Sequence, residues 1–314
     1  EIENIHRISV GQKTGEIVND ENKLTVEEKE WITENIDVVQ TIEIPNDLDV
    51  FGKNGSGVFF DFLEDLEKKY SIKLNAKTYY QGDTIESGSF RIVNDIDENH
   101  VVFYKEHFVV ISKSKVNISS LSQLNNKKIG VLTSDEKSVK KHLSDVSNVM
   151  LTTYETSTSL FQSLETNSDI EFAIIPLEEN LTSILTSNYY IDYHISDLNK
   201  YMVYEVKEND TFSSIVKKYY HTWAKENLQE SINENELKIF VDALSISDKE
   251  IDNIQSKEYE YGFINQSPYE VLIGGTYGGI VSEYITRFSN FSNTEFKSIK
   301  YKNFAKFTEA LANS

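Results

Sequence analysis

The sequence predicts an α/β protein in which one folding unit is repeated. Short apolar segments with the length of β-strands alternate with amphipathic segments that have helical spacing. A strand–turn–helix pattern near the N-terminus recurs close to the C-terminus. Hydrophobic residues make up 39% of the 314, including 17 Phe and 18 Tyr, which is enough apolar surface for a sizeable core. These observations predict one large domain or two ordinary ones rather than a disordered chain.

The N-terminal part begins with a polar, aperiodic stretch over residues 1–23, for which we expect a leader or a loosely packed arm. Thr25 and Glu28 then have the spacing of a capping box, in which each side chain satisfies a free backbone N–H at a helix start. A short helix is therefore expected, followed by a strand over residues 38–44 that Pro45 ends.

The rest of the chain continues this alternation. A turn rich in Gly over residues 52–57 precedes a helix to about Lys69, in which apolar residues recur at helical spacing. The further strands that we predict are 72–74, 90–93, 101–104, 108–111, 128–132, 149–152, 172–175 and 259–264. The further helices are 136–142, 158–164, 177–185, 211–229 and 304–311. Strands that alternate with helices of this length imply parallel strands joined by crossover helices.

An internal repeat is the most informative feature. Residues 57–63 (GVFFDFL) match residues 279–285 (GIVSEYI) without a gap, an offset of 222 positions (279 minus 57). Upstream, residues 24–30 match residues 244–250 at an offset of 220 (244 minus 24). Because the matches occur in the same order, they predict a duplicated domain. The second copy would stop early, so we expect its exposed helix to be ordered by packing on residues 24–110 or across a dimer.

Composition excludes several functional classes. The chain has 31 basic and 51 acidic residues, and a net charge of -20 repels nucleic acid and anionic membrane surfaces. It has no Cys, which excludes thiol catalysis, Cys-ligated zinc and disulfides, and which fits exported proteins of Gram-positive type. No apolar run approaches the roughly 18 residues of a membrane span. We therefore expect any anchor or signal peptide to lie outside this sequence.

Motifs for catalysis and metal binding are not found in the sequence. The six His residues (6, 100, 107, 142, 194 and 221) do not have the spacing of metal ligands. No nucleophile elbow, phosphate loop or dinucleotide fingerprint occurs. We therefore predict no cofactor, no metal and no enzymatic activity.

The order of these elements resembles a known family. Residues 24–32 (LTVEEKEWI), the strand and Gly-rich turn, and residues 57–61 (GVFFD) look like the start of type II periplasmic-binding-protein domains, the Venus-flytrap, family 3 solute-binding modules of bacterial sensor proteins. Residues 103–113 and 118–133 are similar to the family's crossover into its second lobe. The resemblance implies two α/β lobes joined by two hinge strands, with ligand held between them.

The resemblance also implies domain boundaries. We expect an N-terminal arm and capping helix over residues 1–34 and a first flytrap over residues 35–243, with its second lobe at about 113–200. A linker helix and the incomplete start of a second flytrap would occupy residues 244–314. The expected fold class is thus a two-lobed type II periplasmic-binding-protein fold followed by the first part of a second copy.

Three ligand contacts of the family's amino-acid binders are altered here. Ser112 stands where an Arg grips the ligand carboxylate, with Lys113 beside it. Ser134 and Asp135 replace the Gly-Thr at a helix N-terminus, and Pro176 replaces the Asp that meets the ligand ammonium. We therefore expect a small-molecule ligand that is not a standard amino acid, or a cleft that binds none. The ligand-binding candidates are Asp61, Phe103, Tyr104, Lys105, Ser112, Thr133, Ser134, Asp135, Pro176 and Glu178.

The function that we predict is the extracellular ligand-sensing or solute-binding part of a membrane-bound signalling protein, either a histidine kinase or a cyclic-di-GMP enzyme. A tandem repeat favours this role, because transport receptors usually carry one flytrap. Transmembrane and cytoplasmic output domains would follow, and a homodimer is an expected assembly. The alternatives are the solute receptor of an ABC transporter and an enzyme on the same fold.

Overall fold

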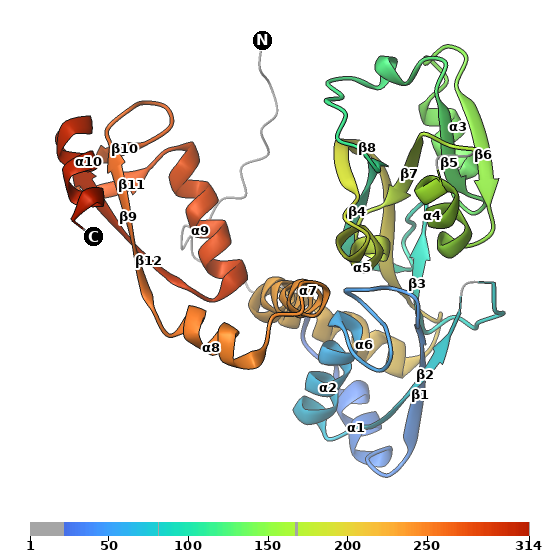
Figure 1. Ribbon diagram of the computed structural model, residues 1–314. Coiled ribbons are helices and arrows are strands. Elements are labelled where there is room, and N and C mark those ends of the chain that lie inside the picture. The colour runs from blue at the N-terminus through green and yellow to red at the C-terminus, as the bar shows by residue number, and fades with distance from the viewer. Residues whose placement is uncertain (1–21, 81, 167–168, 314) are drawn as a thin grey trace.

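The computed structural model describes residues 22–80, 82–166 and 169–313, so the arm predicted over residues 1–23 lies almost wholly outside it. Figure 1 shows two stacked lobes and a C-terminal unit that lies beyond helix α7. None of the helices in these ranges has the length and apolar character that crossing a membrane requires.

Lobe 1 is the lower lobe in Figure 1 and lobe 2 the upper one. Lobe 1 contains α1 (Val26–Glu34), β1 (Val39–Pro45), α2 (Val58–Tyr70), β2 (Lys73–Tyr79), β3 (Ser89–Val93), α6 (Thr211–Trp223), the π-helical turn η4 (Ala224–Leu228) and α7 (Gln229–Ala243). Lobe 2 contains η2 (Leu121–Leu124), β5 (Lys128–Leu132), α3 (Glu136–His142), β6 (Met150–Tyr154), α4 (Ser157–Thr166), β7 (Phe172–Pro176), η3 (Glu178–Asn180) and α5 (Leu181–Thr186). The C-terminal unit contains α8 (Asp248–Gln255), β9 (Glu258–Ile264), β10 (Val271–Ile273), β11 (Thr276–Gly278), α9 (Ile280–Ser292), β12 (Glu295–Tyr301) and α10 (Phe304–Ala312).

Two long antiparallel strands join the lobes, β4 (His100–Ser112) and β8 (Tyr190–Glu205). They belong to one six-stranded sheet with the order β3-β8-β4-β7-β5-β6, in which β5 pairs in parallel with β6 and β7. The register between β4 and β8 shifts at three bulges. The strands predicted at 101–104 and 108–111 are one strand, because the polar residues 105–107 between them pair in register with residues 199–201 of β8.

Each lobe has its own hydrophobic core. The core of lobe 1 is rich in aromatic residues, and its buried members come from two separated stretches of chain, residues 42–103 and 202–232, together with Leu181. The core of lobe 2 covers both faces of the sheet, because successive residues of β4 point to opposite sides. All residues of the lobe 2 core lie between Phe108 and Leu198, in one contiguous stretch. Lobe 2 is thus an insertion into a discontinuous lobe 1.

The C-terminal unit repeats the first turn and helix of lobe 1. In lobe 1, β1 and β2 pair in parallel over seven residues, and β9 and β12 do the same. Gly57 and Gly279 begin α2 and α9 with φ of 119° and 103°. A Cβ at Gly57 would lie 2.6 Å from the Phe51 carbonyl, and one at Gly279 would lie 2.4 Å from the carbonyl oxygen of Tyr269. Glycine is therefore required at both helix starts.

The repeat extends upstream at the same offset, which corrects our alignment there. Thr25 caps α1 and Ser247 caps α8, each in a complete capping box. These residues are 222 positions apart (247 minus 25), whereas the sequence match placed residues 24–30 at an offset of 220. The box at Ser247 identifies the equivalent helix start.

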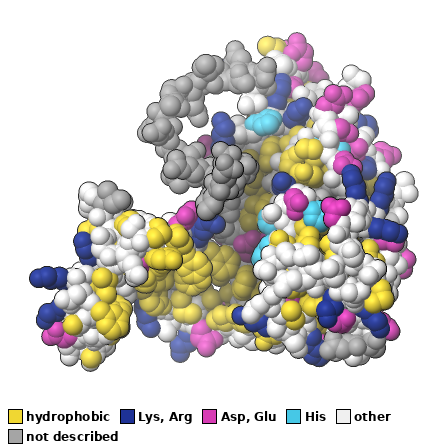
Figure 2. Space-filling model, turned by 90° about the horizontal axis from the view of Figure 1, so that it is seen from above, with side chains coloured by type: hydrophobic (Ala, Val, Ile, Leu, Met, Phe, Trp, Pro, Cys, Tyr) yellow, Lys and Arg dark blue, Asp and Glu magenta, His cyan; other side chains and the backbone are white. Residues whose placement is uncertain are grey.

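The two strand–turn–helix units differ in what covers their helices. Val58, Phe62 and Leu66 of α2 are fully buried, whereas the equivalent Ile280, Tyr284 and Phe288 of α9 are 59%, 70% and 46% exposed. Figure 2 shows hydrophobic side chains gathered on the C-terminal unit at its left. We expected this unit to pack on residues 24–110 or across a dimer; within the chain it packs on α7, where the rings of Phe240 and Phe291 lie 5.3 Å apart. This contact is possible because the helix predicted over residues 211–229 does not end there but continues as α7 to Ala243.

A first prediction concerns the cap of α1. The Thr25 hydroxyl accepts a hydrogen bond from the Glu28 backbone N–H at 3.2 Å, and Glu28 also binds Ser214 and Lys218 of α6. Thr25→Ala is expected to lower the free energy of unfolding by about 1 kcal/mol, which urea denaturation measures. Thr25→Ser, which keeps the hydroxyl, is the control. An unchanged midpoint in Thr25→Ala would show that this cap contributes nothing to lobe 1.

Candidate ligand-binding junction between the lobes

Ionisable side chains replace apolar ones where β4 and β8 pass from lobe 1 to lobe 2. Glu106 of β4 is fully buried and lies opposite Lys200 of β8, which is 3% exposed. Along β4, Glu106 lies between Phe103 of the lobe 1 core and Phe108 of the lobe 2 core. Buried charges are costly unless they are paired, so this position is the first place to look for a function.

Lys200 is the centre of a buried ion cluster. Its Nζ lies 2.6 Å from Asp135 Oδ1 and 3.2 Å from Glu179 Oε1. Glu106 Oε1 accepts a hydrogen bond from the Glu179 backbone N–H at 2.9 Å, while Glu106 Oε2 has no hydrogen-bond partner among the described residues. We call Lys200, Asp135, Glu179 and Glu106 the Lys200 cluster. It connects both hinge strands to two turns of lobe 2.

The Lys200 cluster has more acids than bases. Burial, and then the negative charge of Glu179, raise the pKa of Glu106 well above its ordinary value. Burial likewise raises the pKa of Glu179, although Lys200 opposes the shift. Burial alone would favour the neutral amine of Lys200, but Glu179 and Asp135 outweigh it and raise the pKa of Lys200. The cluster therefore holds a charged lysine and an excess of carboxyl groups.

A second group of acids adjoins the Lys200 cluster, because Glu178 immediately precedes Glu179 in η3. Glu178 of lobe 2 accepts a hydrogen bond of 3.4 Å from the Tyr104 hydroxyl of β4. Burial, followed by the charge of Glu236 on α7, raises the pKa of Glu178 to about 8, and Asp49 adds to the shift. Burial also raises the pKa of Glu236. We call Glu178, Glu236, Asp49 and Tyr104 the Glu178 cluster. Both lobes contribute to it.

Helix α5 holds the lobes together beside the Glu178 cluster. The Thr182 backbone N–H donates to Asp49 Oδ2 at 2.6 Å, and Lys53 pairs with the same carboxylate. Leu181 of α5 is buried in the core of lobe 1, and α5 packs on α7. Movement of the lobes would have to separate these contacts.

The arrangement suits a cation with hydrogen-bond donors. Carboxylates from both lobes converge on the junction, and charge-assisted hydrogen bonds to carboxylates are the strong ones. No group of three or more His, Asp or Glu in the part of the chain that the structure describes is arranged to hold a metal ion.

The structure brings together only some of the residues predicted from sequence. Tyr104, Asp135, Pro176 and Glu178 lie at the junction, where Asn180 donates to the Pro176 carbonyl oxygen. Phe103 is part of the lobe 1 core. The remaining candidates at this end of the lobes, Lys105, Thr133 and Ser134, are exposed.

Two predicted residues lie elsewhere. Asp61 of α2 accepts hydrogen bonds from Ser231 and Asn235, and so joins α2 to α7. Ser112 ends β4 and hydrogen-bonds Asp192. It is eight residues beyond Tyr104, roughly 26 Å at the rise of a β-strand. The position that the resemblance assigned to carboxylate binding is therefore at the far end of lobe 2.

Sequence reasoning did not single out Glu106, Lys200, Asp49 and Glu236. The available signal was the charged residues inside apolar strands, as at residues 105–107. Glu179, the residue after the candidate Glu178, was not among the predicted site residues either. A single charge inside a strand does not show which distant charge it meets.

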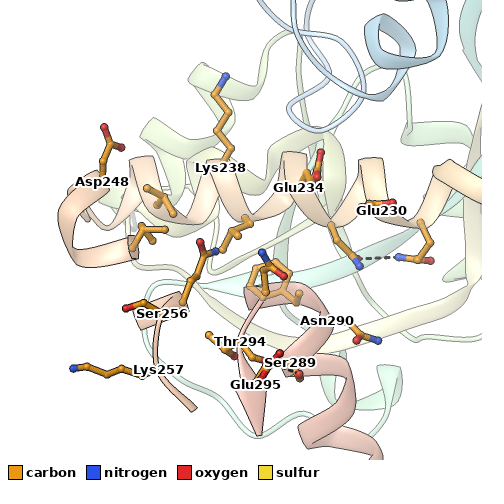
Figure 3. A pocket seen from close by; sticks show the side chains of 18 of the residues that line it. Glu230, Glu234, Lys238, Asp248, Ser256, Lys257, Ser289, Asn290, Thr294 and Glu295 are labelled. Atoms are coloured by element: carbon orange, nitrogen blue, oxygen red, sulfur yellow. Dashed lines mark hydrogen bonds between the residues drawn. The ribbon is translucent and has the colours of Figure 1, made fainter. Parts of the chain in front are cut away.

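A groove of about 1210 Å³ lies outside the lobe junction. Figure 3 shows its side chains from α7, α8 and the C-terminal unit, among them Glu230, Glu234, Lys238, Asp248 and Glu295. Most of these side chains are exposed or half-buried, so it is a solvated gap between two packed units. We do not assign the candidate site to it.

Comparisons with known proteins bear on the fold. No protein-family model matches the sequence, and no curated protein matches it. The periplasmic VFT2 domain of Bordetella pertussis BvgS is similar in structure, with a TM-score of 0.52 and 10% identity over 68% of this chain and 98% of that chain. A double mutant of that domain has a TM-score of 0.53, 10% identity and the same coverage. The fold is that of a two-lobed periplasmic binding protein. The predicted two-lobed α/β fold is confirmed, with β4 and β8 joining the lobes, whereas the second copy over residues 244–314 stays a prediction.

One expectation about the ligand is wrong. We expected a ligand other than a standard amino acid, yet similar solved structures include AbpA of Streptococcus pneumoniae, an amino acid ABC transporter substrate-binding protein bound to L-arginine, with a TM-score of 0.49 and 13% identity over 67% of this chain and 99% of that chain. The expectation rested on Ser112, Asp135 and Pro176. Ser112 is remote from the junction, and the charge of Asp135 is already paired with Lys200. These residues do not exclude amino acids.

Proposed function

We propose that residues 35–243 form a non-catalytic module that binds a small ligand between its lobes, outside the cell membrane. The observation that carries this proposal is the Glu178 cluster, in which Glu178 of lobe 2 meets Tyr104 and Glu236 of lobe 1. A ligand that contacts both lobes favours the arrangement in which they are close, and so shifts the equilibrium between lobe positions.

The ligand class that this chemistry supports is a small organic cation, including amino acids with cationic side chains. The raised pKa of Glu178 reflects burial and repulsion by Glu236, and burial raises the pKa of Glu236. A guanidinium or ammonium group between them would relieve that repulsion and supply hydrogen-bond donors.

We also propose that residues 244–314 begin a second module of the same kind, in a membrane-anchored sensor. The repeat supports this proposal. In lobe 1 the apolar face of α2, which is equivalent to the exposed face of α9, is covered by Tyr219 and Trp223 of α6 and by Phe103 of β4. The α9 face would take an aromatic helix and strand of the same type. Anchor and output domains would belong to other parts of the protein.

Calorimetric titration of the chain tests ligand binding. At least one of L-arginine, L-lysine and agmatine is expected to bind with a saturable isotherm. L-Glutamate is expected not to bind. Glu178→Gln should weaken binding of the saturating ligand about tenfold or more, because it removes a carboxyl group that a bound cation would hold in its charged form. Glu234→Gln, on the exposed side of the same α7 that carries Glu236, is the matched control. Binding of glutamate alone, or of none of the cations, would contradict the proposal.

A further inference from the structure

Lys200 is unusual among the lysines of this chain. Lysine is almost never fully buried unless it is paired, and Lys200 is 3% exposed. Lys218 also pairs with a buried acid, Glu28, but the side chain of Lys218 is 18% exposed. Neither the core packing nor the proposed ligand site requires a lysine at position 200.

The surroundings of the Lys200 ammonium are those of an ammonium-binding site. Carboxylate oxygens of Asp135 and Glu179 lie within 3.2 Å, and the ring centroid of Phe108 is 5.9 Å from Nζ. Carboxylates together with an aromatic face are the groups that bind a primary ammonium in a site shielded from water. The side chains of Asp135 and Glu179 are 0% and 10% exposed, so water cannot replace the cation freely.

The site also contains a carboxyl oxygen, Oε2 of Glu106, that could accept a further hydrogen bond. Glu106 lies opposite Lys200 across the strands, is fully buried, and its Oε2 has no hydrogen-bond partner among the described residues. Removing the ammonium would therefore leave three buried carboxyl groups without a cation. A buried charge left unpaired in this way is strongly destabilising.

We propose that Lys200 is a built-in cation that occupies an ammonium-binding site formed by Asp135, Glu179 and Glu106 at the lobe junction. Lys200 belongs to the hinge strand β8, and its ion pairs connect β8 to the turn before α3 and to the turn η3. This part of the junction is thus held in place without an external ligand. The inference does not depend on ligand binding at the Glu178 cluster.

Chemical rescue tests the proposal in the full chain. Lys200→Ala keeps Cβ and removes the rest of the side chain, which corresponds to a propylammonium group. The substitution is expected to lower the melting temperature by about 10 °C. n-Propylammonium chloride should restore at least half of that loss with a saturable dose dependence. n-Propanol and tetramethylammonium chloride, which lack the charge or the N–H donors, should not.

Lys218→Ala is the matched control, since it removes a lysine that pairs with Glu28 at a more exposed site. Its melting temperature should not respond to propylammonium beyond the effect of the salt. No loss of stability in Lys200→Ala, or equal recovery with n-propanol, would overturn the proposal. If Lys200→Ala does not fold alone, it is refolded with the amine. If folded Lys200→Ala protein is obtained only with propylammonium, the result supports the ammonium-binding site. If no folded protein is obtained at any concentration of the amine, the proposal is overturned.

The outcome is separable from that of the proposed function. Propylammonium rescue reports on the Lys200 cluster in a variant, whereas arginine titration reports on the Glu178 cluster in the unaltered chain. A failed titration with successful rescue would leave the internal cation intact and refute only the external ligand.

Discussion

Phe62→Ala is expected to lower the free energy of unfolding of the lobed region by about 3–5 kcal/mol. Phe62 has no exposed surface, and its ring centroid lies 5.2 Å from those of both Phe103 and Trp223. Alanine would leave a cavity among rings contributed by α2, β4 and α6, which a close-packed core cannot fill by small movements. Urea denaturation followed by tryptophan fluorescence measures the loss.

Tyr284→Ala is the internal control for that experiment. It occupies the equivalent position in α9 but is 70% exposed, so we expect a change within about 0.5 kcal/mol. Equal effects of the two substitutions would contradict the burial difference between the copies. In a longer chain that covers α9, the effect of Tyr284→Ala should rise toward that of Phe62→Ala.

Glu178→Gln is expected to flatten the dependence of stability on pH. The folded protein holds the Glu178 proton up to a pKa of about 8, against an ordinary value of 4.5. Between these values the folded state binds a proton that the unfolded state has lost, so the contribution of Glu178 to stability is full below about pH 4.5 and is lost as pH rises toward 8. The slope is up to about 1.4 kcal/mol per pH unit for one proton.

The neighbours of Glu178 determine how much of that slope remains. Glu236, Asp49 and Tyr104 face Glu178 directly. Since Glu106 and Glu179 also have raised pKa values, we expect Glu178→Gln to reduce the slope without abolishing it. Denaturation midpoints of the chain, Glu178→Gln and the exposed control Glu234→Gln from pH 5 to pH 8.5 provide the measurement. Parallel curves for the chain and Glu178→Gln would refute the assignment.

Local sequence patterns predicted much of the fold, because amphipathic spacing and glycine geometry are local. The helix from Val58 and its repeat from Ile280 follow from apolar spacing after a glycine, and the structure has both. Strand β8 was not predicted, because Asp192, Asn199 and Lys200 interrupt its apolar pattern. The antiparallel partner β4 pairs along its whole length, and this long-range pairing overrides the weak local preference.

The candidate site was less predictable for a related reason. Tyr104 and Glu178 were found through the resemblance, Tyr104 in the stretch similar to the crossover between lobes and Glu178 beside Pro176, the position of the ammonium contact. Glu106 and Lys200 carry the unusual electrostatics, yet their meeting depends on the register between strands almost a hundred residues apart in sequence. No local pattern specifies which buried acid a lysine will reach.

The inserted arrangement of lobe 2 also orders events during synthesis on the ribosome. All core residues of lobe 2 have been made once the chain reaches Leu198. The core of lobe 1 starts earlier in the chain but has to wait for Met202, Tyr219 and Trp223. Because a contiguous core needs no long-range closure, the later-starting lobe can be complete before the earlier one. The apolar face of α2 therefore stays uncovered on the nascent chain until α6 emerges.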